Sequence, residues 1–97
     1  MIDLNCVAEL CHTIAKQRGQ IGEKVSHRET ADDIGREFTE FIKASETEPS
    51  VHLPEFTEAQ EELADILITC LTELSRRKVN IEDIIIKKAC FNRTRDI

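Results

Sequence analysis

Two pairs of acidic residues are the part of this sequence best suited to chemistry. Glu37 and Glu40 lie in the segment REFTE, and Glu62 and Asp65 lie in EELAD. The spacing of three residues puts both carboxylates of a pair on one side of a helix, at the border of its apolar stripe. Two helices packed through these stripes would gather four like charges, which is unfavourable unless a cation lies among them. Mg²⁺ prefers carboxylate oxygens and water, so the pattern favours a magnesium site, in which Mn²⁺ could substitute.

Neither pair is distinctive by itself, since 19 of the 97 residues are acidic. Glu55 with Glu58, and Glu58 with Glu61, show the same spacing, and a solvated helix face is the alternative interpretation of any single pair. The two pairs differ from the others because both helices repeat one arrangement. Each has an acid at the edge of its apolar face and a second acid one step further round, which is where helical bundles build metal sites.

A second group of polar side chains lies towards the C-terminal end of the sequence. Lys88, Asn92 and Arg95 share one helix face with Ile81 and Ile85. Lysine and asparagine on an apolar face cost free energy unless each finds a partner, and a carboxylate cluster or a phosphate held by it would be such a partner. The alternative is that Lys88 extends into solvent and that Arg93 and Arg95 stabilise the helix C-terminus.

The pattern of apolar residues predicts an all-α chain of four helices. The first spans about Asp3 to Arg18, with Asp3 as its N-cap, and residues 20–25 form a loop. The second has two overlapping capping signals, Ser26-x-x-Glu29 and Thr30-x-x-Asp33, and fades near Ser45.

In the second half of the chain, the apolar spacing and capping residues predict two further helices after a proline-containing connection over residues 46–55. The third helix starts near Thr57, with Gln60 completing a capping box. The fourth begins at Asn80. Residues 84–86 are three isoleucines that could form a short strand, but the cap, the acids that follow it and the basic residues at the far end favour a helix.

The third helix predicts self-association. Its apolar residues cover more than half of its circumference, from Ile66 through Leu63, Leu67 and Leu71 to Ile68. A helix that is apolar over so wide an arc is buried on more than one side. We therefore expect a four-helix bundle-like subunit that assembles into a homo-oligomeric helical bundle, either a dimer or a tetramer built as a dimer of dimers.

Composition narrows the class of protein. A length of 97 residues predicts a single domain over 1–97, and the net charge of −6 argues against nucleic-acid polymers and anionic membrane surfaces as partners. The chain shows no signal-peptide pattern and no span apolar enough for a bilayer. Its four cysteines have neither zinc-type nor CxxC spacing, which favours free thiols and a cytoplasmic location.

The order of these motifs resembles the MazG-like family of all-α nucleoside triphosphate pyrophosphohydrolases. ExxE falls on Glu37 and Glu40, and ExxD falls on Glu62 and Asp65. The closing segment IEDIIIKKACFNRTR is similar to the last helix of the family, and the resemblance covers roughly 30–95. It implies that the four acids bind magnesium and serve catalysis, and that Lys88 and Asn92 match positions associated with phosphate and metal-bound water. Arg36 stands where the family motif has a leading acid.

The resemblance also implies an activity. Family members hydrolyse (deoxy)nucleoside triphosphates to the monophosphate and pyrophosphate, in a house-cleaning role for the nucleotide pool. Phe56 and His52 are among the candidate contacts for the substrate base, and Arg95 joins Lys88 and Asn92 as a candidate substrate-binding residue. Two alternatives stay open: an enzyme like phosphoribosyl-ATP pyrophosphatase, and a non-catalytic helical interaction or regulatory module.

Overall fold

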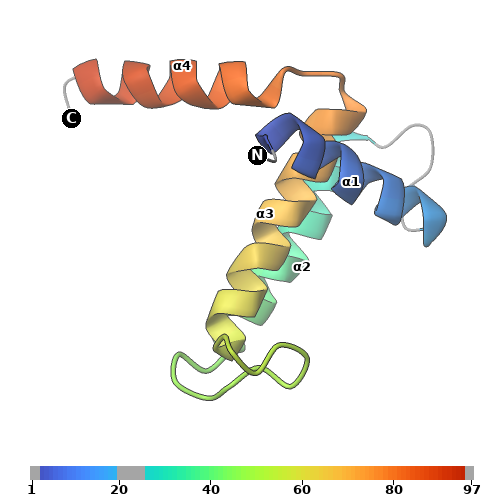
Figure 1. Ribbon diagram of the computed structural model, residues 1–97, viewed down its shortest axis with the longest axis vertical. Coiled ribbons are helices and arrows are strands. Elements are labelled where there is room, and N and C mark those ends of the chain that lie inside the picture. The colour runs from blue at the N-terminus through green and yellow to red at the C-terminus, as the bar shows by residue number, and fades with distance from the viewer. Residues whose placement is uncertain (1–2, 20–25, 96–97) are drawn as a thin grey trace. The chain divides into compact units, whose positions relative to one another are not determined.

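The computed structural model describes residues 3–19 and 26–95, and over these ranges the chain forms four helices and no strand (Figure 1). The helices are α1 (Leu4–Gln17), α2 (His27–Lys43), α3 (Glu58–Arg76) and α4 (Ile81–Thr94). The expected all-α class is confirmed. None of the described helices combines the length and the apolar character that crossing a bilayer requires. The loop expected over 20–25 lies outside the described residues.

The chain divides into two compact units. The hairpin unit comprises Ile21–Cys70, and the terminal unit comprises Met1–Gln20 together with Leu71–Ile97. Helix α3 contributes to both units, because the division falls between Cys70 and Leu71. All four predicted acidic ligands belong to the hairpin unit.

Local capping explains where α1 and α4 begin. Asp3 Oδ1 accepts a hydrogen bond from Cys6 N at 2.8 Å, and Asn80 Oδ1 accepts one from Asp83 N at 3.1 Å. Both predicted N-caps are therefore confirmed. The strand alternative for residues 84–86 is wrong, because a capped start with acids in the first turn commits the segment to a helix.

Of the two capping signals that precede α2, the structure uses the first. Ser26 Oγ accepts a hydrogen bond from Glu29 N at 3.1 Å, and the helix starts at His27. Thr30 then lies inside the helix, and its buried Oγ1 has no hydrogen-bond partner among the described residues. Ser26 is used as the cap because a helix that begins there pairs the backbone N–H groups that Thr30 would otherwise cap.

The start of α3 is a reciprocal capping box. Thr57 Oγ1 accepts from Gln60 N at 3.2 Å, and Gln60 Oε1 accepts from Thr57 N at 2.9 Å. Both side chains satisfy backbone donors that the first helical turn cannot pair. The predicted start of the third helix is confirmed.

The connection between α2 and α3 ties the two helices into a hairpin, in which they run side by side (Figure 1). Ala59 N donates to Ser45 O at 3.0 Å, and Ser45 N donates to Glu58 Oε2 at 3.2 Å. Ser50 N donates to Phe56 O at 2.8 Å inside an isolated bridge between Pro49 and Thr57. The connection is thus an ordered turn that fixes how α3 leaves α2.

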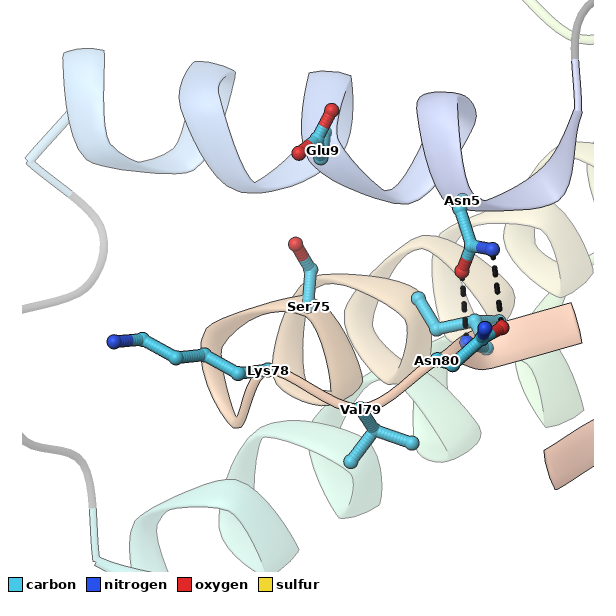
Figure 2. A pocket seen from close by; sticks show the side chains of 7 residues that line it. Asn5, Glu9, Ser75, Lys78, Val79 and Asn80 are labelled. Carbon is cyan, nitrogen blue, oxygen red and sulfur yellow. Dashed lines mark hydrogen bonds between the residues drawn. The ribbon is translucent and has the colours of Figure 1, made fainter. Parts of the chain in front are cut away.

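The terminal unit has a small apolar core. Ala8, Leu71 and Ile81 are buried, and partly buried apolar side chains pack against them: Leu4, Val7 and Leu74. Figure 2 shows Asn5 of α1 reaching the start of α4, where its Oδ1 accepts from Ile81 N at 2.7 Å and its Nδ2 donates to Asn80 Oδ1 at 3.1 Å. Leu4 N donates in turn to Glu82 Oε1 at 3.0 Å. The first turns of α1 and α4 therefore cap each other.

Large apolar side chains remain exposed in both units of the single chain. On α3 these are Leu63, Leu67 and Ile68, and on α4 they are Ile84, Ile85, Ile86 and Phe91. Every residue of α4 from Asp83 onwards is exposed. Of the apolar arc that the sequence predicts on the third helix, Leu63, Leu67 and Ile68 are exposed in the single chain, whereas Leu71 is buried in the core of the terminal unit.

Candidate functional site

Three of the four predicted acidic ligands come together in the hairpin unit. Glu37 and Glu40 of α2 and Glu62 of α3 each offer a carboxylate oxygen, and these oxygens all lie within 4.8 Å of one another. Glu37 and Glu62 are half-buried, and Glu40 is exposed. Separations of this size place the three groups around a volume that one cation could occupy. We call these residues, with Asp65, the carboxylate cluster.

Asp65 is not among the three closest groups, but it is electrostatically part of the same site. Its negative charge raises the pKa of Glu62 and of Glu37, in each case after the larger effect of burial. Burial likewise raises the pKa of Asp65, and the charges of Glu61 and Glu40 raise it further. Each of these shifts has the sign expected when like charges are crowded in a partly desolvated place.

Glu62 has a buried carboxylate oxygen, Oε2, that lacks a hydrogen-bond partner among the described residues. A carboxylate oxygen removed from water without a partner costs free energy, which a bound cation would recover. The donor set, made of carboxylate oxygens only, suits a hard cation such as Mg²⁺.

Beside the cluster, Glu61 anchors the α2–α3 connection. Its carboxylate accepts a short hydrogen bond from the Ser50 hydroxyl, and its Oε1 lies 3.1 Å from His52 Nδ1. Ser50 is only 2% exposed, and its Oγ also accepts from Leu53 N at 3.1 Å. These bonds lower the pKa of Glu61, led by the one from Ser50. Glu61 is thus a structural acid that holds the turn against α3.

Sequence reasoning missed the anchoring roles of Glu58 and Glu61 and treated both as surface acids. The available signal was weak, since it consisted of hydroxyl residues in a proline-bracketed connection followed by acids in the first turn of the next helix. Capping potential of this kind is visible in a sequence, but its partner is chosen by the path of the turn.

The predicted substrate-binding residues Lys88, Asn92 and Arg95 lie at the exposed end of the terminal unit. Lys88, Asn92 and the helix cap Arg95 are all exposed, and Lys88 Nζ lies 4.8 Å from the centre of the Phe91 ring. This cation–π contact accounts for the lysine without a buried partner. Their expected role towards a phosphate stays a prediction. Of the candidate base contacts, His52 and Phe56 are both exposed residues of the α2–α3 connection.

The terminal unit also contains an open cavity of about 400 Å³ between α1 and the link from α3 to α4 (Figure 2). Its lining includes Asn5 and Asn80, whose side chains are engaged in capping α4. Glu9, Ser75 and Lys78 complete its polar wall. No residue of the carboxylate cluster lines it.

Comparison of the chain with models of protein families finds no match. Comparisons with curated proteins and with solved structures also find no match. The geometry of the carboxylate cluster and the motifs of the sequence are therefore the basis for inferring function.

Proposed function

We propose that this protein is a magnesium-dependent nucleoside triphosphate pyrophosphohydrolase of the MazG-like kind. The observation that carries the proposal is the grouping of Glu37, Glu40 and Glu62 within 4.8 Å, with Asp65 coupled to them. The resemblance of ExxE and ExxD to the family motif supplies the reaction class. The cellular role that fits is removal of unwanted (deoxy)nucleoside triphosphates from the cytoplasmic pool.

The residues present fit a divalent cation. The buried Oε2 of Glu62 provides an oxygen that no described residue satisfies, and Glu37 and Glu40 provide oxygens from the facing helix. Asp65 would complete the donor set or bind a water of the cation. When bound, the cation would neutralise phosphate charge and make the α-phosphorus a better electrophile. Mn²⁺ has similar ligand preferences and could substitute.

The carboxylates themselves suit the handling of a proton. Water attacks the α-phosphorus, the bond from this phosphorus to the bridging oxygen breaks, and pyrophosphate leaves. One cluster carboxylate accepts the proton that the water loses. Burial and neighbouring charge raise the pKa of Glu37, Glu62 and Asp65, and a raised pKa makes a carboxylate a better proton acceptor.

Lys88, Asn92 and Arg95 are proposed to bind the phosphates of the substrate. Their support is chemical. Helix α4 offers a lysine and an amide from adjoining turns, its C-cap offers an arginine, and all three residues are exposed. Lysine and arginine are the usual cationic partners of phosphate oxygens.

We further propose that the working form is a homo-oligomer, a dimer or a dimer of dimers. Its support is the exposed apolar surface of α3 and α4, which includes Ile68 at 44% and Ile86 at 61% exposure. Large apolar side chains exposed along a helix mark an interaction site. A symmetric interface through these helices would repeat the carboxylate cluster once in each subunit.

A substrate panel tests the activity. Purified protein with Mg²⁺ should release pyrophosphate from at least one nucleoside triphosphate, and chromatography should show the monophosphate as the other product. Asp65→Asn or Glu40→Gln should abolish turnover, and Glu46→Gln, an exposed acid of the connection, should not. Orthophosphate and a diphosphate as products would refute the assignment. Including phosphoribosyl-ATP in the panel separates the related enzyme class.

The non-catalytic alternative is favoured by the same exposed apolar surface, which an interaction module would also need. A thermal melt separates the two hypotheses. A metal site predicts stabilisation by millimolar Mg²⁺ beyond the effect of matched ionic strength. A simple interaction module predicts that Mg²⁺ and an equivalent sodium salt act alike.

A further inference from the structure

We infer that His52 contacts a phosphate oxygen of the bound nucleoside triphosphate through its Nε2 atom. This inference rests on the proposed function and adds to it a substrate contact from outside the motifs. His52 lies in the α2–α3 connection, in the same compact unit as the carboxylate cluster.

The first support is position. His52 Nδ1 lies 3.1 Å from Oε1 of Glu61, which precedes Glu62 in the sequence. Glu61 and Asp65 are four residues apart on α3, so their side chains are neighbours on one face of the helix. The charge of His52 also acts on Asp65, opposing the effects that raise its pKa. The imidazole therefore stands at the rim of the carboxylate cluster.

The second support is orientation. The His52 backbone N donates to Ser50 Oγ at 3.2 Å, and the same buried hydroxyl donates to Glu61. The backbone of His52 is thus linked to the Glu61 carboxylate through Ser50, and its ring contacts the same carboxylate directly. With Nδ1 engaged by Glu61, Nε2 points away from this contact, and among the described residues it has no hydrogen-bond partner. The ring is pre-positioned with one polar atom free.

The third support is that the contact with Glu61 has little structural value by itself. The His52 side chain is 82% exposed, and an ion pair of such an exposed group adds little to stability because solvent screens it. Ser50 already holds Glu61 through a buried bond. Orienting the imidazole towards a ligand gives the arrangement a purpose that stability alone does not.

The fourth support is charge. Residues 26–70 contain 12 acids and 3 arginines or lysines. Arg28 is paired with Asp32, and Arg36 is paired with Asp33. A polyphosphate approaching so acidic a unit needs cationic donors besides the metal. When both ring nitrogens carry a hydrogen, His52 can donate Nδ1–H to Glu61 and Nε2–H to a phosphate oxygen.

Two probes test the contact in the presence of Mg²⁺, one with a nucleobase and one without. One is a nucleoside triphosphate analogue with a methylene group between the α and β phosphorus atoms, and the other is inorganic pyrophosphate. The variants are His52→Phe, which keeps a ring without a donor, and His52→Gln, which keeps a neutral donor. His27→Phe is the matched control, because His27 is an exposed histidine of the same unit.

Calorimetry should show that His52→Phe weakens binding of both probes about ten-fold or more, as expected for loss of a charge-assisted hydrogen bond. His52→Gln should lose less, and His27→Phe should bind like the wild type. In turnover assays the loss should appear mainly in KM, and the melting temperatures of the variants should match the wild type.

The outcomes separate this inference from the proposed function. Turnover with unchanged KM and unchanged probe binding in His52→Phe overturns the inference and leaves the hydrolase intact. Weakened binding of the analogue with unchanged binding of pyrophosphate assigns His52 to the base and also overturns it. His52-dependent binding of both probes without turnover supports the contact and refutes the hydrolase. A wild-type protein that binds neither probe refutes both.

Discussion

Glu37 and Glu62 hold carboxylate oxygens within 4.8 Å of each other from two different helices. Burial and the charges of their acidic neighbours raise the pKa of both residues. The folded state therefore binds protons at these two carboxyl groups more tightly than the unfolded chain does, and a bound cation would offset the cost of their charged form. The stability of this protein should depend on metal and on pH in ways that scattered surface acids cannot reproduce.

Replacing Glu37 should weaken metal binding and stabilise the metal-free protein. Glu37→Gln removes one of the crowded charges, so the metal-free variant should melt at a higher temperature than metal-free wild type. Wild type at a Mg²⁺ concentration about 100 times its Kd should gain about 2.7 kcal/mol, and the variant should gain much less. Calorimetric melts with and without Mg²⁺ measure both effects, and Glu46→Gln is the control. Equal stabilisation of wild type and Glu37→Gln by Mg²⁺ would place the metal elsewhere.

The pH dependence should run in one direction for the metal-free cluster. A folded-state pKa raised above the usual 4.5 of Glu62 or the usual 3.8 of Asp65 means that the folded state binds the proton more tightly. The contribution of Glu62 and Asp65 to the free energy of unfolding is complete at pH values below their usual pKa. It is lost as the pH rises through the raised pKa values of the folded state. Glu61 has a lowered pKa and acts in the opposite sense, losing its contribution as pH falls.

The difference between wild type and a variant isolates the cluster from such opposing groups. Between about pH 4 and neutrality, the free energy of unfolding of metal-free wild type should fall relative to that of Glu62→Gln. Urea unfolding across this range measures it. If the difference between the two proteins does not change with pH, the carboxylates are not coupled in solution.

Ser50 should matter more to stability than its type suggests. Its buried hydroxyl donates to Glu61 and accepts from the backbone N–H groups of His52 and Leu53. Ser50→Ala leaves these groups without their partner, and we expect a loss of about 1–3 kcal/mol. Chemical denaturation measures the loss, with Thr13→Ala, an exposed helical hydroxyl, as the comparison. A loss as small as that of the comparison variant would mean that water replaces the hydroxyl.

Self-association should depend on the apolar arc of α3. Light scattering of wild type at micromolar concentration should give a mass at least twice the 11.1 kDa of the chain. Ile68→Glu should dissociate the oligomer or unfold it, because an unpaired charge would be buried at the interface. Gln60→Glu, on an exposed polar position of the same helix, should leave the mass unchanged. A wild-type mass near that of one chain would contradict the proposal.

Sequence predicts the parts of this fold that local chemistry decides. Asp3, Asn80 and the pair of Thr57 and Gln60 cap helices through bonds to residues at most three positions away, so their roles follow from spacing. Three of the four predicted acids come together for a related reason. Each pair shares one face of its helix, and the ordered connection over residues 44–57 folds α3 back towards α2.

Contacts across the chain could not be predicted in this way. Nothing in the sequence around Asn5 shows that its side chain will bond to Asn80 and Ile81, because the choice depends on how α1 meets α4. The role of Glu61 was missed for the same reason, since its partners Ser50 and His52 reach it only after the connection folds back. The spacing of Ile34, Phe38 and Phe41 suggests that Phe38 is a core residue, but it is 48% exposed in the single chain.

The mutual capping of α1 and α4 has a consequence for the order of folding. Leu4 N donates to Glu82, and Ile81 N donates to Asn5. The first turn of each helix is therefore satisfied in part by a residue 76 or more positions away in the sequence. A nascent chain emerging from a ribosome can complete the α2–α3 hairpin before Glu82, the acceptor for Leu4 N, has been synthesised. Closing so long a loop carries a large entropic cost, and contacts of this sequence separation slow folding. The hairpin that bears the carboxylates is therefore expected to form first, and the docking of the two chain ends to be the late, rate-limiting event.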